Sequence, residues 1–176
     1  QGVSARVYPA LVPREHPLAA VRGAFNAVFV EAEAAGSLMF YGSGAGGTQT
    51  ASAVLGDLVS AAKRHVAGGP GLADSVHANL PVLPIDRINT RYQITIQAKD
   101  QPGVLAQIAN LFAQHGVSVE TVEQSVNPAK AGVVPTASLM IGTHEATDAS
   151  LSAVVTSLAA SDAVESITSV IRVEGL

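Results

Sequence analysis

A glycine-rich loop follows an apolar segment in the first third of the chain, "FYGSGAGGTQTASAV" at residues 40–54. Gly42, Gly44 and Gly47 have the G-x-G-x-x-G spacing of loops that hold the pyrophosphate of a dinucleotide at the start of a helix. The full pattern also needs a second strand ending in an acidic residue about 20 residues further on. Asp74 has roughly that spacing but lies in "AGGPGLADSV", which does not have the pattern of a strand. The fingerprint is therefore incomplete, and a tight strand-to-helix turn that uses glycine for positive φ is an alternative.

A second loop that could bind a ligand is "DQPGVL" at residues 100–105, between an alternating strand and an amphipathic helix. The start of a helix exposes unpaired N–H groups and a partial positive charge, which suits the carboxylate of an amino acid. Gly103 carries no side chain that would block access. Asp100 is either the N-cap of the helix, with no ligand present, or a partner for the ammonium group of a ligand. The sequence leaves both alternatives open.

Other site chemistries find little support in the sequence. The chain has no Cys, which excludes disulfides, thiol nucleophiles and Cys-based metal sites. Ser, His and Asp occur without a nucleophile-elbow motif, which excludes a hydrolase of that kind. The histidines show no metal-ligand spacing, so we assign them to structural or surface roles and predict no metal; they are His16, His65, His77, His115 and His144.

The net charge of −4 on the 176 residues is unevenly placed. Residues 1–90 carry six basic and six acidic side chains, whereas residues 91–176 carry four basic and eight acidic ones. Neither half has the basic stripe of a nucleic-acid-binding protein, so we expect no nucleic-acid partner. No apolar run reaches the roughly 18 residues that cross a bilayer, and the lack of Cys fits a cytoplasmic protein. Because the chain lacks an initiating Met, we expect a fragment of a longer protein.

The second half contains the elements that would position the loop at residues 100–105. We predict strands in "RYQITIQAK", "VSVETVEQSV", "VVPTASLMIG" and "VESITSVIRVEG", helices starting at Pro102 and in "HEATDASL", and a turn at "NPAKAG". In the last strand, Ile167, Ile171 and Val173 are predicted to share one face. The order β-α-β-β-α-β with right-handed crossovers places both helices on one face of a four-stranded antiparallel sheet. This is a ferredoxin-like module whose open face or edge we expect to meet a partner.

The first half contains too few elements to close a core. We predict strands in "SARVYPALVP", "AFNAVFVEA" and "GSLMFYGS", a helical turn in "HPLAAV", and a helix over residues 48–66 capped by Thr48 or Thr50. Without a second covering layer, this half should depend on further residues or on another subunit. Residues 67–90 are rich in Gly, Pro, Asn and Asp and are predicted to form a linker with one short extended piece at Leu80–Ile85.

The second half resembles an ACT domain, the small-molecule-binding regulatory module of amino-acid metabolism. The resemblance rests on the element order over residues 91–174 and on "DQPGVLAQIANLFAQHGVSVETV", which matches the family's D-x-P-G-x-L followed by its helix and strand. It implies a ligand at an interface between two ACT domains, bound by the loop of one and the facing second strand of the other. The positions that match are Asp100, Gln101, Gly103, Val104, Leu105, Val119 and Glu120. Many ACT domains only dimerise, so that alternative also stays open.

The first half resembles the C-terminal part of the catalytic region of the homoserine dehydrogenase family. The matching stretches are "VYPALVPREHPLAAVRGAFNAV" and "YGSGAGGTQTASAVLGDLV". The family pattern is close to Y/G-x-G-A-G-x-x-x-T-A-x-A-V-x-x-D, and Ser43 stands where the family often has Pro. The resemblance implies that Gly42, Gly44, Ala45 and Gly46 let the backbone approach the nicotinamide end of an NAD or NADP cofactor held mainly by another domain.

Together the two resemblances imply an α+β protein with residues 1–66 as the end of a catalytic and dimerisation sheet with its helix, 67–90 as a linker, and 91–176 as a ferredoxin-like ACT domain. They imply an NAD(P)-dependent oxidoreductase that interconverts aspartate semialdehyde and homoserine for threonine and methionine biosynthesis. They also imply threonine as a feedback ligand, and a homo-oligomer joined through the ACT sheet edge and the first-half sheet.

The family's Rossmann domain and catalytic Lys have no counterpart in this chain, and Lys63 lies in the wrong motif. We therefore expect no catalytic residue, no bound cofactor and no activity in this chain alone. The alternative is a non-catalytic amino-acid-binding or dimerisation module.

Overall fold

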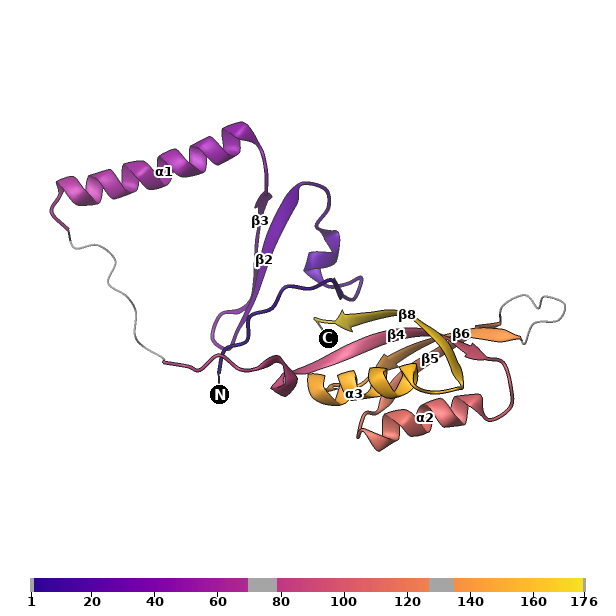
Figure 1. Cartoon of the computed structure of the whole chain (residues 1–176). Coiled ribbons are helices and arrows are strands. Elements are labelled where there is room, and N and C mark those ends of the chain that lie inside the picture. The colour runs from indigo at the N-terminus through magenta and orange to yellow at the C-terminus, as the bar shows by residue number, and fades with distance from the viewer. Residues whose placement is uncertain (1, 70–78, 127–134, 176) are drawn as a thin grey trace. The chain divides into compact units, whose positions relative to one another are not determined.

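The computed structural model describes residues 2–69, 79–126 and 135–175 and is shown in Figure 1. It divides into two compact units: one runs to Val12 and resumes at Leu80, and the other spans Pro13–Asn79. This division differs from the predicted one in that residues 2–12 group with the C-terminal unit. The predicted turn "NPAKAG" and part of the predicted linker lie outside the described residues.

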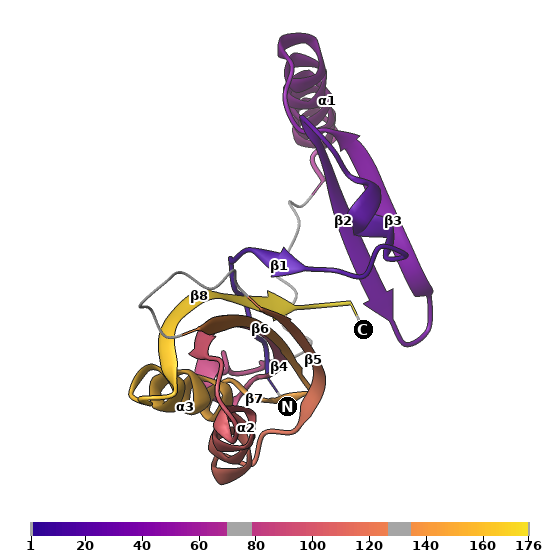
Figure 2. The ribbon, with the colours of Figure 1, turned by 90° about the vertical axis from the view of Figure 1, so that its right-hand side faces the viewer.

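The C-terminal unit is built on a curled antiparallel sheet. Its four long strands, in spatial order, are β8 (Val164–Val173), β4 (Asn89–Lys99), β6 (Thr136–Thr143) and β5 (Val119–Val126). Helices α2 (Val104–Gln114) and α3 (Asp148–Ala159) both lie on one face of this sheet (Figure 2). The predicted βαββαβ order and the ferredoxin-like fold are thereby confirmed.

The core of this unit lies between the sheet and the two helices. The large side chains below 2% exposure come from alternate positions of the central strands and from the inner stripes of the helices; among them are Ile94, Ile96, Ile108, Phe112, Ile141, Leu151, Val154 and Leu158. Fully burying one such side chain stabilises the fold by about 1.5–3 kcal/mol. The period-two patterns of β4 and β6 therefore correctly predicted which faces of these two strands turn inward.

The residues before Val12 add a short strand to the edge of this sheet. Strand β1 (Ala10–Leu11) pairs in parallel with β8, and an isolated bridge joins Val3 to Val82. The predicted strand in "SARVYPALVP" is thus wrong over most of its length. Proline has no N–H to donate to a ladder, and Pro9 and Pro13 flank β1 closely. The segment before β4 also contains a single turn of 3-10 helix, η2 (Ile85–Arg87). After β6, a two-residue strand, β7 (Ala146–Thr147), pairs with the start of β4.

The last strand pairs with β4 through two register shifts, and the one at Thr95/Ile96 makes the predicted inner face wrong. Ile167 lies opposite Ile96 and faces the helices, whereas Ile171 lies opposite Gln93 on the other face. The register shifts where Thr95 and Ile96 of β4 meet β8, because one extra residue of β8 is inserted there. An inserted residue reverses the alternation of a strand beyond it. Val173 consequently lies with Ile171 on the open face, and Arg172 takes an inward position.

The N-terminal unit is an antiparallel hairpin followed by one long helix. Its elements are the 3-10 turn η1 (Pro17–Ala20), β2 (Phe25–Ala32), β3 (Gly36–Ser43) and α1 (Gly47–Val66). None of its described residues is buried. The prediction that this half does not close a core is confirmed.

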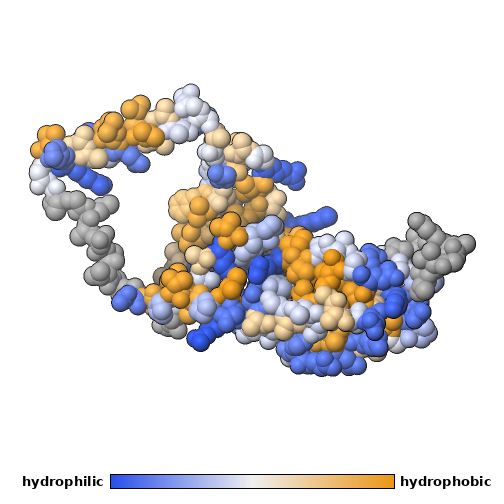
Figure 3. Space-filling view, viewed as in Figure 1, coloured by the Kyte–Doolittle hydropathy of each residue, from blue (hydrophilic) through white to orange (hydrophobic). Residues whose placement is uncertain are grey.

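The exposed surface of this unit is strongly apolar. On α1, Val54, Leu55 and Leu58 are 56–61% exposed, and Figure 3 shows the hydrophobic colouring along this helix. On the hairpin, Val28 and Phe40 are 61% and 64% exposed. Within the described residues, no helix is both long and apolar enough to span a membrane.

Candidate functional site

The glycine-rich loop connects the end of β3 to the start of α1. Gly46 is the N-cap residue of α1, with φ of 144°, and no side chain caps the helix. The predicted capping by Thr48 or Thr50 is therefore wrong. Gly46 occupies a backbone region that favours glycine, so its conformation begins the helix without help from a hydroxyl group.

Gly44 brings the loop backbone close to the first strand of the hairpin. A Cβ atom at Gly44 would lie 2.2 Å from Nδ2 of Asn26, and the Gly44 amide donates a hydrogen bond of 2.8 Å to the carbonyl of Ala24. Gly42 is itself part of β3 and pairs with Asn26. The loop thus follows an antiparallel hairpin, whereas the dinucleotide fingerprint requires a parallel βαβ unit. The literal G-x-G-x-x-G match is not a dinucleotide-binding fold.

Two open hollows adjoin this loop. The larger, of about 810 Å³, is lined by Gly44, Ala45, Gly46, Gly47, Thr50, Ala51, Val54 and Leu55. The smaller, of about 240 Å³, is lined by Asn26, Ala27, Val28, Phe40, Tyr41, Gly42, Ser43 and Gly44. Neither lining contains a charged side chain. This surface suits the close approach of a flat, neutral ring, and it lacks the cations that usually accompany phosphate groups.

The predicted ligand loop of the C-terminal unit has a different helix start from the one expected. Helix α2 begins at Val104, and its N-cap is Gly103 with φ of 89° and no capping side chain. Pro102 lies in the preceding turn, and the alternative in which Asp100 is the N-cap of α2 is wrong. The backbone N–H of Asp100 donates a hydrogen bond of 2.8 Å to the carbonyl of Pro135. The side chains of Asp100 and Gln101 are exposed.

The remaining residues of the predicted ligand-binding site, Val119 and Glu120, lie at the start of β5. The Glu120 carboxylate is 3.2 Å from the guanidinium of Arg91, near the start of β4. Asp100 follows Lys99 at the other end of β4. The eight residue-to-residue steps of extended strand from Arg91 to Lys99 span about 26 Å. One chain therefore does not bring the two sets together, and a site made from both would need a second copy.

A buried polar cluster joins β4, α3 and β8. Nη2 of Arg172 lies 2.6 Å from Oδ1 of Asp148, and the Tyr92 hydroxyl donates to the same oxygen at 3.0 Å. Asp148 is only 6% exposed and is the first residue of α3, where the helix dipole favours a negative charge. Thr147 is the N-cap of α3 and accepts a hydrogen bond from the amide of Ser150.

The same cluster holds the segment before β1. The Tyr8 hydroxyl donates a hydrogen bond to the carboxylate of Glu174, and the Arg172 guanidinium lies 4.8 Å from the centroid of the Tyr8 ring and 5.3 Å from that of Tyr92. Burial raises the pKa of Tyr92 and of Tyr8 above the ordinary value, and in Tyr8 the Glu174 carboxylate raises it further. The hydrogen bond to Asp148 raises the pKa of Arg172.

This cluster was not predicted from the sequence. A charged residue at an inward strand position is a signal for a buried ion pair. An alternation continued from Ile167 would place Arg172 outward, and the register shift between Ile167 and Ser169 turns it inward.

Two of the described histidines, His16 and His115, have structural side-chain contacts. Nδ1 of His16 accepts a hydrogen bond of 3.2 Å from the amide of Leu18 and thereby caps η1. Nε2 of His115 lies 2.8 Å from Oγ of Ser157, which links α2 to α3. His77 lies outside the described residues. The described residues contain no group of three or more His, Cys, Asp or Glu side chains arranged to hold a metal ion.

Comparisons with known proteins bear on both halves of the chain. The family model of homoserine dehydrogenase matches residues 1–59, and that of the ACT domain matches residues 92–162. A homoserine dehydrogenase of Mycobacterium tuberculosis is 55% identical over 99% of this chain and 40% of its own length. That of Corynebacterium glutamicum is 48% identical over 98% of this chain and 37% of its own length.

A solved structure extends the similarity to three dimensions. The crystal structure of a homoserine dehydrogenase from Thiobacillus denitrificans superposes with a TM-score of 0.86 at 34% identity, covering 98% of this chain and 39% of that one. The chain spans about 40% of the length of the curated relatives that it matches. The chain is therefore similar over nearly its whole length to one part of the homoserine dehydrogenases, and its residues 92–162 match the ACT domain.

Proposed function

We propose that this chain is part of an NAD(P)-dependent homoserine dehydrogenase that interconverts aspartate semialdehyde and homoserine in threonine and methionine biosynthesis. The observation that carries the proposal is the 55% identity to a homoserine dehydrogenase over 99% of the chain. Both family models match in the order expected for an enzyme with a regulatory domain behind its catalytic region.

The glycine-rich loop would contribute to the nicotinamide site. The cofactor supplies a hydride acceptor or donor when it is bound. Backbone atoms of Gly42, Gly44, Ala45 and Gly46 would contact and orient the nicotinamide ring, because the hollows beside them are open and have no charged lining. The adenosine and phosphate groups, and the choice between NAD and NADP, would belong to residues upstream.

The chain alone should be inactive. The hairpin and α1 have no buried residue among their described positions, so they need the remaining part of the catalytic region to cover them. Lys63 lies in the last turn of the exposed α1, far along the helix from the glycine loop. Nothing in this arrangement supports a catalytic role for it.

Regulation by threonine would require two copies of the ACT domain. The loop positions Asp100, Gln101, Gly103, Val104 and Leu105 of one copy would face Val119 and Glu120 of another, since one chain holds these sets at opposite ends of β4. Strand β5 supports such pairing, because it forms the free edge of the sheet and is exposed along nearly its whole length. The apolar hairpin of the N-terminal unit would supply a second interface between copies.

The activity is tested by joining the chain to the part of the Mycobacterium tuberculosis relative that it does not match. We expect this chimera to oxidise NAD(P)H with aspartate semialdehyde and the 176-residue chain to show no turnover. Gly44→Val in the chimera should abolish turnover, because a side chain there would displace Asn26. A folded chimera without turnover would overturn the proposed activity.

The regulation is tested separately in the same chimera. Threonine should inhibit it, and both Asp100→Asn and Glu120→Gln should weaken that inhibition while leaving turnover without threonine unchanged. Inhibition that both variants leave intact would remove these residues from the threonine site.

A second candidate function applies to the C-terminal unit by itself. This unit has its own complete core, unlike the hairpin and α1. The isolated chain would then act as an amino-acid-binding or dimerisation module without catalysis. Calorimetric titration of the chain with threonine measures binding, and sedimentation measures dimerisation. Together they distinguish a module that binds threonine, one that only dimerises, and one that does neither.

A further inference from the structure

The side chain of Asn26 lies against the backbone of the glycine-rich loop. Asn26 belongs to β2 and pairs with Gly42 of β3, and the loop continues from the end of β3 to Gly44. A Cβ atom added to Gly44 would lie 2.2 Å from Nδ2, 2.5 Å from Cγ and 2.7 Å from Oδ1 of Asn26. The carboxamide group of Asn26 therefore fills the place that a side chain at Gly44 would take.

Gly42, the strand partner of Asn26, leaves the space beside it open. A Cβ atom added to Gly42 would meet nothing within 4 Å, so the Asn26 side chain leans toward Gly44 instead. The smaller of the two hollows at this loop has Asn26, Gly42 and Gly44 in its lining, and Gly44 also lines the larger one. The carboxamide thus stands at the edge of an open space that a ligand can enter.

The fold does not use the polar atoms of this carboxamide. A side-chain amide has two N–H donors and one carbonyl acceptor. The Asn26 side chain forms no hydrogen bond with any other residue that the structure describes. The backbone holds the loop instead, because the Gly44 amide donates a hydrogen bond of 2.8 Å to the carbonyl of Ala24. Donor and acceptor of Asn26 are therefore both available to a ligand.

The surface next to Asn26 is apolar. Val28 and Phe40 pair across the hairpin, and alternation along β2 places Val28 on the same face as Asn26. Their side chains are 61% and 64% exposed, and both line the smaller hollow. A flat apolar group can therefore lie on this surface with a polar substituent next to Asn26.

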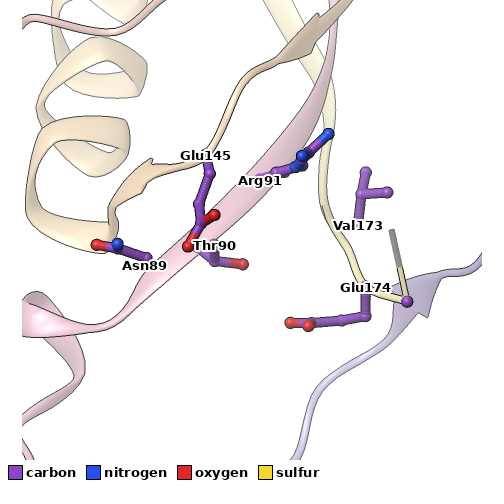
Figure 4. A pocket seen from close by; sticks show the side chains of 7 residues that line it. Asn89, Thr90, Arg91, Glu145, Val173 and Glu174 are labelled. Carbon is purple, nitrogen blue, oxygen red and sulfur yellow. The ribbon is translucent and has the colours of Figure 1, made fainter.

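The uncharged lining of this hollow contrasts with that of a cavity in the C-terminal unit. That cavity, at the start of β4, combines the carboxylates of Glu145 and Glu174 with the guanidinium of Arg91 (Figure 4). Charged groups of this kind form their strongest hydrogen bonds with ionised partners. The hollow at Asn26 has one amide and no charged side chain in its lining, so it favours a ligand group that is neutral.

A carboxamide is well complemented by another carboxamide. Each has N–H donors and a carbonyl acceptor, so two of them can pair through two hydrogen bonds. A carboxylate or a phosphate only accepts hydrogen bonds, so it would leave Oδ1 of Asn26 unpaired, and the lining has no cation for it. The reduced nicotinamide ring is flat and uncharged and carries one carboxamide, so the residues present fit this group.

We propose that Asn26 recognises the carboxamide of the nicotinamide ring through hydrogen bonds from Nδ2 and to Oδ1. This inference rests on the dehydrogenase function proposed above and adds a side chain of the hairpin to the backbone positions of the glycine-rich loop. Gly42 leaves room for the ring, and Gly44 lets Asn26 approach the loop. Two hydrogen bonds to one carboxamide restrict the rotation of the ring, which contacts with backbone atoms alone do not.

The test uses the chimera described above, and its readout is binding instead of turnover. Calorimetric titration measures the affinity for NADH or NADPH, whichever binds more tightly, and for its 3-acetylpyridine analogue, in which a methyl group replaces the carboxamide nitrogen. We expect the natural dinucleotide to bind about tenfold more tightly, because the analogue leaves Oδ1 of Asn26 without a donor. Asn26→Leu keeps a side chain of similar size against Gly44 but forms no hydrogen bond, so the preference should fall to about twofold or less.

Val30→Ala is the matched control, because Val30 lies further along the same face of β2 and does not line the hollow. It should leave the preference unchanged. Asn26 and Val30 are both exposed, so the variants should fold, which circular dichroism checks. The proposal would be overturned by an undiminished preference in Asn26→Leu. Equal binding of the two dinucleotides by the unsubstituted chimera, as a contact between Asn26 and the adenine would give, would also overturn it.

The two proposals fail in different ways. A folded chimera whose preference depends on Asn26 but which shows no turnover overturns only the proposed activity. Turnover together with the same preference in Asn26→Leu overturns only the role of Asn26. A folded chimera that binds neither dinucleotide overturns both.

Discussion

Arg172 and Asp148 form an ion pair across the C-terminal unit, with 2.6 Å between Nη2 and Oδ1 and side-chain exposures of 21% and 9%. The pair ties the last long strand to the first residue of α3, and the Tyr92 hydroxyl joins it from the central strand. It exists because the β8 bulge turns Arg172 inward. A local irregularity of one residue thus determines a contact between three elements.

Asp148→Asn should strongly destabilise the C-terminal unit. Removing one charge of a buried pair leaves the other charged group without compensation, which costs about 3 kcal/mol or more. The matched control is Glu120→Gln, which breaks the exposed pair with Arg91 and should change stability by less than about 1 kcal/mol. Urea unfolding followed by circular dichroism measures both. Equal losses in the two variants would contradict the importance of the buried pair.

Stability should fall at alkaline pH, and Tyr92 should contribute to the fall. Its pKa is raised in the folded state by burial above the ordinary value of 10.0, so the fold favours the neutral phenol. This contribution is fully present below about pH 10 and is lost as pH rises through the raised pKa. Tyr92→Phe should make the alkaline decline of unfolding free energy shallower. A slope in Tyr92→Phe that equals or exceeds that of the unsubstituted chain would contradict the prediction.

Two glycine-to-alanine changes should have opposite signs. Gly103 has φ of 89° with open space around it, so alanine there would meet backbone strain alone and cost about 1–2 kcal/mol. Gly56 lies within α1 with nothing within 4 Å of an added Cβ, so alanine should stabilise that helix by about 0.5–1 kcal/mol. Thermal unfolding of the two variants tests this. A loss of stability in both variants would show that packing, and not backbone conformation, determines the effect of alanine at these positions.

Two large side chains of α2 should differ sharply in their importance for folding. Phe112 is 1% exposed and Leu105 is 47% exposed. Phe112→Ala should cost about 3–5 kcal/mol through the cavity that it leaves. Leu105→Ala should cost less than about 1 kcal/mol, so it can serve to test the threonine site without a loss of fold. A similar loss in both variants, measured by urea unfolding, would contradict the described packing.

The sequence predicts the central architecture well because the alternation in β4 and the helical spacing in α2 and α3 both report burial directly. Ile94 and Ile96 face inward as their spacing requires, and Ile108 and Phe112 form one buried stripe. The inner face of β8 was not predictable in this way. A bulge reverses the alternation, and no residue type in "ESITSVIRV" marks its position.

Helix starts and long-range pairing were predicted less well, for different reasons. Threonine and aspartate are common N-caps, yet Gly46 and Gly103 begin α1 and α2 because each adopts a positive φ that local propensity does not reveal. The pairing of Ala10 with Arg172 depends on a partner far along the chain. The predicted ligand set combined residues by family resemblance, and only the strand register shows that one chain separates them.

The contact between Tyr8 and Glu174 joins residues 166 positions apart, which has a consequence for the time order of folding. Ribosomes add about 5–20 residues per second, so the segment before β1 waits roughly 8–33 s for its partner strand to be made. During that interval β4, α2, β5, β6 and α3 can already assemble from contacts closer in sequence. Capture of the early segment by the finished edge of β8 is then the closing step in the maturation of this unit, and any protease or chaperone that acts on the nascent chain meets that segment while it is still undocked.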